Sequence, residues 1–178
     1  DLVKAIQLVC PGPLKTMKFL QQLANDRLDQ GYGYMTWTSP SGFPVIYTCN
    51  HQRSEKQRGT ISGLGQINHV AKVDTNVSDR RGFMCGISPN FIHSQDAAHM
   101  SLVVDQFEGD FGAVHDSFST HASDVEELLT ITKGVFISMY NEDNYFNNIQ
   151  ARIEATAVQP ELGGLDIEDV EKSDYFFA

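Results

Sequence analysis

The sequence has no long apolar run and few cysteines. None of its 178 residues lies in a stretch approaching the ~20 apolar residues of a transmembrane helix, so we expect no membrane span. The three cysteines, Cys10, Cys49 and Cys85, are far apart and form no C-x-x-C pair, which argues against a disulfide framework and suits a reducing compartment. No basic segment precedes an apolar one at the N-terminus, as a signal peptide would require. Residue 1 is Asp rather than Met, so we expect the chain to be a fragment, a processed product or part of something longer.

Positive charge is scarce, with 13 Lys and Arg residues against 23 Asp and Glu residues. Residues 82–132 contain no Lys or Arg but eight acidic residues, whereas residues 50–85 contain six basic residues against three acidic ones. This segregation fits either two solvated faces or a nucleic-acid-contacting segment beside a cation-binding site. Charge alone does not choose between them.

The first half of the chain predicts two helices, two strands and a long arm. Apolar spacing indicates helices over residues 2–9 and about 14–28, interrupted by Pro11-Gly12-Pro13 and ended by Gly31 and Gly33. Aromatic and β-branched residues indicate strands at 34–38 and 45–48. From about Tyr47 to Asp79 the chain is polar and without helical periodicity, which favours a long β-hairpin, here called the arm.

The second half predicts a helix, a short hairpin and two further helices. Ile87-Ser-Pro-Asn90 should precede a helix from Phe91 to about Phe107, followed by a hairpin over 111–120 with residues 115–117 at its turn. Ser123 and Glu126 form a capping-box sequence for the next helix, and 141–157 should be helical before an acidic tail. With 41% apolar and 20% charged residues, and no linker or repeat, the chain is expected to be one α+β unit.

Asp116 is the most prominent candidate for chemistry. A carboxylate at a hairpin apex is held by both strands and suits Mg²⁺, which prefers oxygen ligands, although Asp in a turn is more often a turn former. His93 and Asp96 share a helix face, whereas His99 does not, and without a third ligand zinc is disfavoured. On spacing alone, His93 fits a capping or surface histidine. A serine nucleophile near His115 is disfavoured, because no G-x-S-x-G elbow is present.

Four segments in order resemble the single-subunit RNA polymerases of bacteriophages and mitochondria. Ile87-Ser-Pro-Asn-Phe-Ile-His-Ser-Gln-Asp96 and Val114-His-Asp-Ser-Phe-Ser-Thr120 resemble the family's P-N-F-[VI]-H-S-x-D helix and its motif C hairpin. Trp37-Thr-Ser-Pro-Ser-Gly-Phe-Pro-Val45 and Ser173-Asp-Tyr-Phe-Phe-Ala178 resemble an upstream family segment and its aromatic C-terminus. The resemblance implies that the chain is the C-terminal part of a polymerase palm. It divides residues 1–178 into helices (1–30), a strand and specificity-hairpin-like arm (34–82), a His93 helix with motif C hairpin and following helix (83–145), and a C-terminal helix and foot (146–178).

The same resemblance implies a role for individual residues. Asp116 matches the aspartate that binds both catalytic Mg²⁺ ions, His115 would position the primer end, and His93 would contact the newest base pair in the minor groove. The arm matches the element that recognises promoter DNA in the major groove. Its candidates for nucleic-acid contact are Arg53, Lys56, Arg58, Gln66 and Asn68, and the candidate active-site foot is Phe176, Phe177 and Ala178.

The implied reaction is template-directed RNA synthesis by two-metal nucleotidyl transfer on DNA, RNA and NTPs. A second aspartate (motif A) and a fingers helix are not recognisable here, so a partner chain or region should supply them, and the chain alone should be inactive. We expect the other acidic residues between positions 82 and 132 to lie away from the hairpin apex. The alternatives are a non-catalytic DNA-binding subunit with a palm fold and a family A DNA polymerase fragment. The resemblance implies the cytoplasm of an infected host cell, or an organelle.

Overall fold

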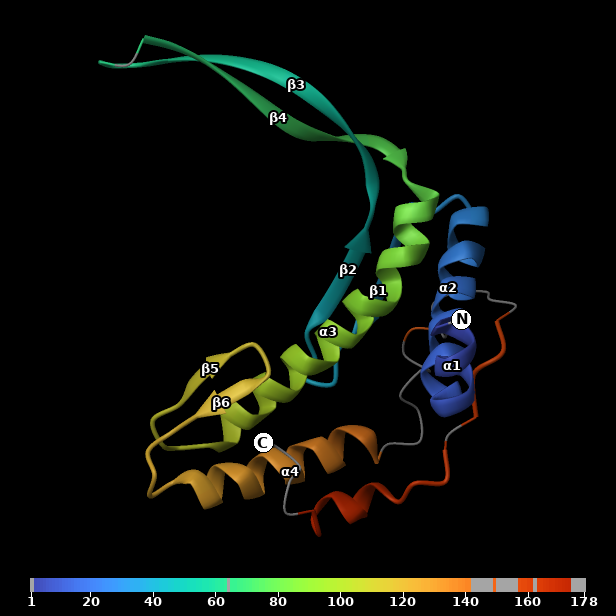
Figure 1. Ribbon diagram of the computed structural model, residues 1–178, viewed down its shortest axis with the longest axis vertical. Coiled ribbons are helices and arrows are strands. Elements are labelled where there is room, and N and C mark those ends of the chain that lie inside the picture. The colour runs from blue at the N-terminus through green and yellow to red at the C-terminus, as the bar shows by residue number, and fades with distance from the viewer. Residues whose placement is uncertain (1, 64, 142–148, 150–156, 162, 174–178) are drawn as a thin grey trace.

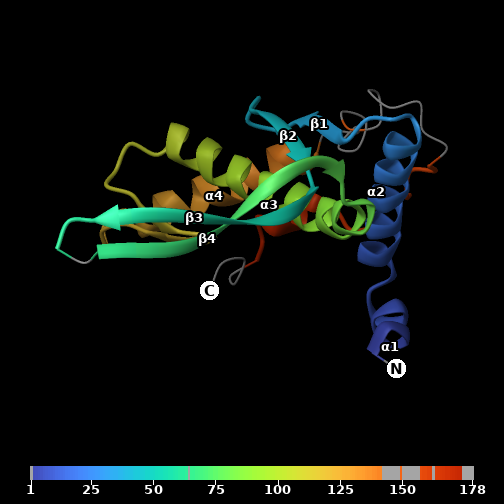
Figure 2. The ribbon, with the colours of Figure 1, turned by 90° about the horizontal axis from the view of Figure 1, so that it is seen from above.

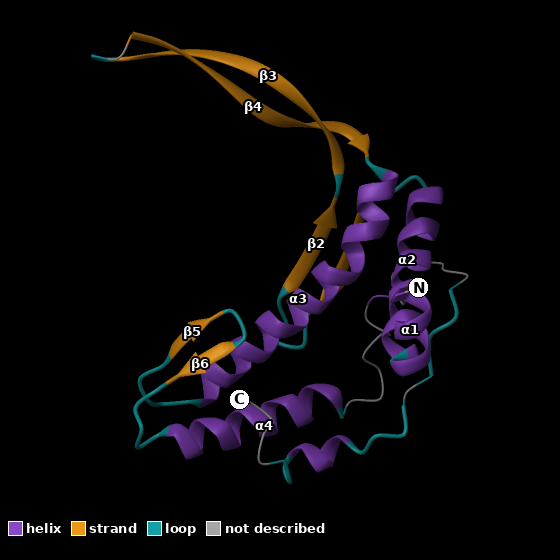
Figure 3. Ribbon diagram, in the orientation of Figure 1, coloured by secondary structure: helices purple, strands orange, loops and turns teal. Residues whose placement is uncertain are grey.

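The computed structural model describes residues 2–63, 65–141, 149, 157–161 and 163–173 (Figure 1). Its β-structure consists of antiparallel pairs, β1 with β2, β3 with β4 and β5 with β6, which form separate two-stranded sheets among the helices (Figure 3). The mixed α and β composition expected from the sequence is confirmed. The elements are α1 (Leu2–Val9), α2 (Pro11–Asp29), β1 (Tyr34–Thr38), β2 (Pro44–Thr48), β3 (Asn50–Ile61), β4 (Gly65–Ser78), α3 (Arg80–Gln106), β5 (Gly112–Val114), β6 (Ser117–Ser119), α4 (Val125–Tyr140) and the 3-10 helix η1 (Ile167–Val170).

The two predicted N-terminal helices are present, but their junction lies earlier than expected. Cys10 separates them and α2 begins directly at Pro11, because proline is tolerated in the first turn of a helix, where its missing N–H would have no partner. Gly31 ends α2 as predicted, with φ of 86° and its N–H bonded to the Leu28 carbonyl. In Figure 2, α1 projects beyond the end of α2. None of the described helices is long and apolar enough to cross a membrane.

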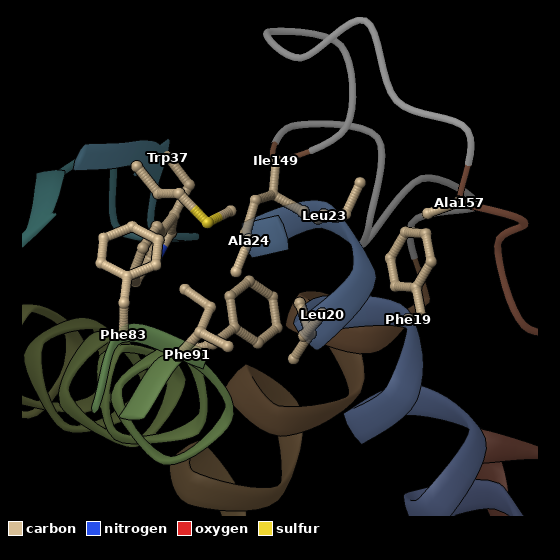
Figure 4. Close-up of a cluster of buried hydrophobic side chains, with 11 residues drawn as sticks. Phe19, Leu20, Leu23, Ala24, Trp37, Phe83, Phe91, Ile149 and Ala157 are labelled. Atoms are coloured by element: carbon tan, nitrogen blue, oxygen red, sulfur yellow. The ribbon is translucent and has the colours of Figure 1, made fainter. Parts of the chain in front are cut away.

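The first hydrophobic cluster joins α2, β1 and the N-terminal half of α3 (Figure 4). Trp37 of β1 packs on Phe91 of α3, with ring centroids 5.8 Å apart, and its indole N–H donates to Ser94 Oγ at 2.9 Å. Arg80, the first residue of α3, pairs with Asp29 of α2 at 2.7 Å. The cluster therefore fixes α3 against the N-terminal helices. Its most buried side chains include Leu20, Leu23, Met35, Trp37, Phe83 and Ile87.

The expected start of α3 at Phe91 is wrong, because the helix already begins at Arg80. Asp79 caps it by accepting a hydrogen bond from the Gly82 N–H at 3.0 Å. Pro89 lies inside the helix, at a typical cost of ~3 kcal/mol. Phe83 and Ile87, both fully buried, lie one turn apart on the face that enters the cluster. The free energy gained by burying these large side chains outweighs the effect of Pro89, which led us to expect a non-helical segment before Phe91.

The predicted arm is confirmed as a long antiparallel hairpin of β3 and β4, with a turn at residues 62–63 after β3. It leaves the body at the N-terminal end of α3 and extends away from it (Figure 1). Most of its described residues are exposed and none is buried. Since no core supports it along its length, its direction depends on its attachment at the base.

A second cluster joins the C-terminal half of α3 to α4, with Ala98, Val103, Leu128, Val135 and Met139 among its members. The buried His99 ring lies 3.0 Å from the Thr132 carbonyl, so this histidine has a structural partner. The predicted capping box is wrong: Asp124 rather than Ser123 is the N-cap, and it makes no side-chain cap hydrogen bond. The helix predicted over 141–157 falls almost entirely outside the described residues, as does the foot, Phe176, Phe177 and Ala178.

Replacing Leu23 with alanine should lower the free energy of unfolding by about 2–5 kcal/mol, because Leu23 is completely buried in the first cluster. The matched control is Leu8→Ala on α1, where the leucine is 84% exposed and the expected change is below about 0.5 kcal/mol. Chemical denaturation of both variants measures the difference. Equal losses would contradict the packing of α2 described above.

Candidate active site and nucleic-acid arm

The β5–β6 hairpin closes with a two-residue turn, His115-Asp116, because Val114 pairs directly with Ser117. His115 has φ of 57° and is the one described non-glycine residue with positive φ. The favoured two-residue hairpin turns require positive φ at their first central position, which explains this conformation. For a histidine it is uncommon and stores strain of order 1–3 kcal/mol, a feature that often accompanies functional sites. The turn fixes Asp116 at the apex, as the sequence predicted.

Aromatic packing holds the hairpin against α3. Phe118 of β6 lies 5.3 Å from Phe111 and 6.0 Å from the His99 ring, measured between ring centroids. Thr120 donates a hydrogen bond to the Asp110 carbonyl at 2.7 Å, which closes the base of the hairpin. The apolar base is thus anchored in the second cluster while the apex stays exposed.

An open pocket of about 670 Å³, here called the hairpin pocket, lies between the hairpin and α3. The hairpin contributes Ala113, His115 and Asp116, and α3 contributes His93, Asp96, Ala97 and Met100. His93 and Asp96 share one helix face, as their spacing predicted. The four polar side chains are all exposed. The pocket brings two carboxylates and two imidazoles from separate elements to one place.

The presence of Asp96 in this pocket corrects one expectation, that the other acidic residues of 82–132 lie away from the apex. Part of this arrangement was predictable, since the spacing places Asp96 on the same helix face as His93. The sequence does not show the tertiary contact that places the hairpin beside the face of α3 that carries His93 and Asp96. Asp105, Glu108 and Asp110 do not line the pocket.

The pocket fits part of a Mg²⁺ site. The Asp116 carboxylate offers the hard oxygen ligands that Mg²⁺ prefers, at an exposed and rigidly held position. Among the described residues, however, no group of three His, Cys, Asp or Glu side chains is close enough to hold a metal ion. Asp116 can therefore contribute one carboxylate to such a site, and the described residues do not complete it.

The two faces of the arm differ in chemistry. Residues paired across the hairpin share a face, and neighbours along a strand alternate between faces. Lys56, Arg58 and Asn68 share one face, because Arg58 pairs with Asn68 and Lys56 is two residues from Arg58. Gln66 and Lys72 lie on the same face, paired with Thr60 and Ser54. This polar face thus presents four of the five candidate contact residues, with Lys72 as a further cation.

Arg53 lies on the opposite face, paired across the strands with Val73. Its guanidinium forms an ion pair with Glu55 at 2.6 Å, and Glu55 is on that same face. Ile67, Ala71 and Val73 share this face and make it less polar. The structure therefore separates Arg53 from the other candidates, which the sequence had grouped together.

Comparisons with known proteins agree on one family. A profile of the DNA-dependent RNA polymerase family matches residues 2–159. The mitochondrial DNA-directed RNA polymerase 1 of Arabidopsis thaliana is 32% identical over 149 residues, covering 79% of this chain and 15% of that protein. T7 RNA polymerase of Escherichia phage T7 is 26% identical over 159 residues, covering 80% and 18%. The mitochondrial enzyme of Homo sapiens is 29% identical over 200 residues, covering 100% and 16%. The chain spans less than a fifth of each of these relatives.

Two substitutions at His115 should show how much the positive φ of this residue costs in stability. His115→Val should destabilise the protein by at least about 1 kcal/mol more than His115→Gly, because a β-branched residue is disfavoured at positive φ and glycine is not. Ser117→Val, at an exposed strand position, is the control and should be nearly neutral. Thermal unfolding measures all three. Equal destabilisation by Val and Gly at position 115 would contradict the turn geometry.

Proposed function

Because this chain belongs to the DNA-dependent RNA polymerase family, we propose that it forms the C-terminal part of a polymerase palm and supplies one catalytic aspartate, Asp116, to template-directed RNA synthesis. The observation that carries the proposal is the hairpin pocket, where Asp116 faces His93 and Asp96 across a gap open to solvent. A carboxylate held at a hairpin apex by paired strands has the rigidity that positioning catalysis requires.

The residues of the pocket take separate roles in nucleotidyl transfer. Mg²⁺ ions, when bound, would supply charge stabilisation for the phosphate that is transferred. Asp116 would hold these ions through its carboxylate, and His115 beside it would position the 3′ end of the RNA. His93, exposed on α3, would donate or accept a hydrogen bond in the minor groove of the newest base pair. Such a contact tests pairing geometry rather than sequence, because the minor groove presents a degenerate pattern.

The reaction requires a partner region. Two catalytic ions ~3.5–4 Å apart need converging carboxylates, and no three His, Cys, Asp or Glu side chains of the described residues are grouped closely enough to hold a metal ion. We assign the second aspartate and the nucleotide-binding fingers helix to the remaining polymerase. Asp96 lines the same pocket and, within the described part of the chain, is the one other acidic residue placed to assist Asp116 there.

The arm would contact promoter DNA with its polar face. Lys56, Arg58 and Lys72 can neutralise backbone phosphates, while Gln66 and Asn68 can form hydrogen bonds with base edges in the major groove. Arg53 is already paired with Glu55 and points to the other face, so it has no part in this contact. The arm's exposure and its extension away from the body support the proposal.

Asp116→Asn should reduce nucleotide addition by the complete, Mg²⁺-supplied polymerase to below about 1% of wild type, since loss of one transition-state-stabilising group costs roughly 10²- to 10³-fold. DNA binding should persist, because the aspartate's negative charge does not attract phosphate. The control is Asp105→Asn, an exposed change on α3 outside the pocket, which should leave activity unchanged. Substantial activity in Asp116→Asn, or RNA synthesis by this chain alone, would refute the proposal.

Neutralising the polar face of the arm should weaken promoter-directed initiation. With Lys56, Arg58 and Lys72 changed to Gln, the log–log salt dependence of promoter binding should fall by about 0.9 per phosphate contact removed. Extension of a preformed RNA–DNA hybrid should be unaffected. Arg53→Gln, on the opposite face, is the matched control and should change neither assay. Equal loss in both assays, or an equal effect of Arg53→Gln, would show that this face does not contact promoter DNA.

A further inference from the structure

The base of the arm is attached to α3 through one strand face. β2 and β3 follow one another with Cys49 between them, and the side chains of Val45, Tyr47 and Cys49 pack against the first hydrophobic cluster. The intervening Ile46 and Thr48 are exposed. One face of β2, just before the arm begins, therefore packs against the N-terminal turns of α3.

Tyr47 makes the most specific contact at this base. Its hydroxyl lies 3.0 Å from the Phe83 carbonyl and 3.3 Å from the Gly82 carbonyl, and donates to them. Its ring packs on Phe83 with centroids 4.9 Å apart. Burial, together with the nearby Cys49, Cys85 and Asp79, raises the pKa of Tyr47 from 10.0 to about 12, so the hydroxyl stays a protonated donor further into the alkaline range.

Two glycines of α3 make room for this contact. A Cβ atom on Gly86 would lie 2.4 Å from the Tyr47 hydroxyl, and one on Gly82 would lie 2.8 Å from Cys49 Sγ. Both distances are too short for non-bonded atoms, so any larger residue displaces the strand or its side chains. Glycine is disfavoured inside a helix relative to alanine, and here the close approach of β2 explains its presence.

The second strand of the arm joins α3 at the same place. The Asp79 N–H, just after β4, donates to the Cys49 carbonyl at 2.9 Å, and the Asp79 carboxylate caps α3 at Gly82. Both strands thus meet the first two turns of a single helix. His93 lies seven residues beyond Gly86 on that helix, about 10 Å along its axis, and lines the hairpin pocket.

We propose that Tyr47 is a positioning residue: its hydroxyl, packed over Gly86, sets the direction of the arm relative to the hairpin pocket. The role follows from the contact geometry, since Tyr47 joins the arm to the helix that carries His93 and Asp96. The functional consequence rests on the proposed function, in which the arm places promoter DNA at the site of synthesis. Tyr47 touches neither DNA nor substrate in this role.

Three variants of the complete polymerase test this role: Gly86→Ala, Tyr47→Phe and the double variant. Gly86→Ala pushes the Tyr47 hydroxyl away from its acceptors, and Tyr47→Phe removes it. Each should reduce promoter-directed initiation roughly fivefold, the factor expected for one lost hydrogen bond, while extension of a preformed hybrid stays unchanged. The double variant should be no worse than Gly86→Ala, because phenylalanine removes the atom that the alanine methyl meets.

Gly134→Ala on α4 is the matched control, since a Cβ there would have no neighbour within 4 Å. It should leave initiation unchanged. A purely structural role of Tyr47 would instead lower the melting temperature and reduce both assays together. Additive losses in the double variant, or full initiation in Gly86→Ala, would overturn the proposal.

A distance measurement tests the geometry independently of promoter recognition. Spin labels at the exposed Ser62, near the arm tip, and Glu127, on α4, should give a narrow distance distribution by pulsed electron paramagnetic resonance. The distribution should shift or broaden in Gly86→Ala but not in Gly134→Ala. An unchanged distribution would refute the positioning role. If the distance distribution changes but the variant with Lys56, Arg58 and Lys72 replaced initiates normally, Tyr47 positions the arm but the proposed function of the arm is wrong.

Discussion

The apolar face of α3 packs into the two hydrophobic clusters of the described residues, Phe83 and Ile87 into the first and Ala98 and Val103 into the second. Because one continuous helix enters both clusters, it is held along its whole length. Its N-terminal turns then support the arm, and its exposed middle faces the β5–β6 hairpin across the hairpin pocket. The burial of this one face of α3 therefore fixes the position of the arm relative to the hairpin pocket.

The exposed candidate catalytic side chains lie on elements whose other side is packed in the core. Asp116 is exposed at an apex whose base is anchored by Phe111 and Phe118, and His93 is exposed on a helix buried on its other side. The strained His115 backbone lies at the same apex. A site built in this way is preorganised before ligands bind, which is what the proposed nucleotidyl transfer would require of it.

The sequence predicted local features well and tertiary ones poorly. The arm, the β5–β6 hairpin and the shared face of His93 and Asp96 followed from polarity and spacing, and the resemblance to phage-type polymerases is confirmed by the family match. The start of α3 was missed because Pro89 and nearby glycines argue locally for a loop, whereas buried aromatic packing decides. The presence of Asp96 in the same pocket as Asp116 depends on the docking of the hairpin against α3, which no local pattern encodes.

The central claim, that Asp116 is one half of a shared metal site, is tested most directly by anomalous scattering from Mn²⁺ in crystals of the complete polymerase. We predict manganese peaks about 2 Å from the Asp116 carboxylate, with a second carboxylate from outside this chain bound to the same ions. Manganese bound elsewhere, with Asp116 free, would contradict the assignment of Asp116. A site completed by Asp96 alone would contradict the need for a partner carboxylate.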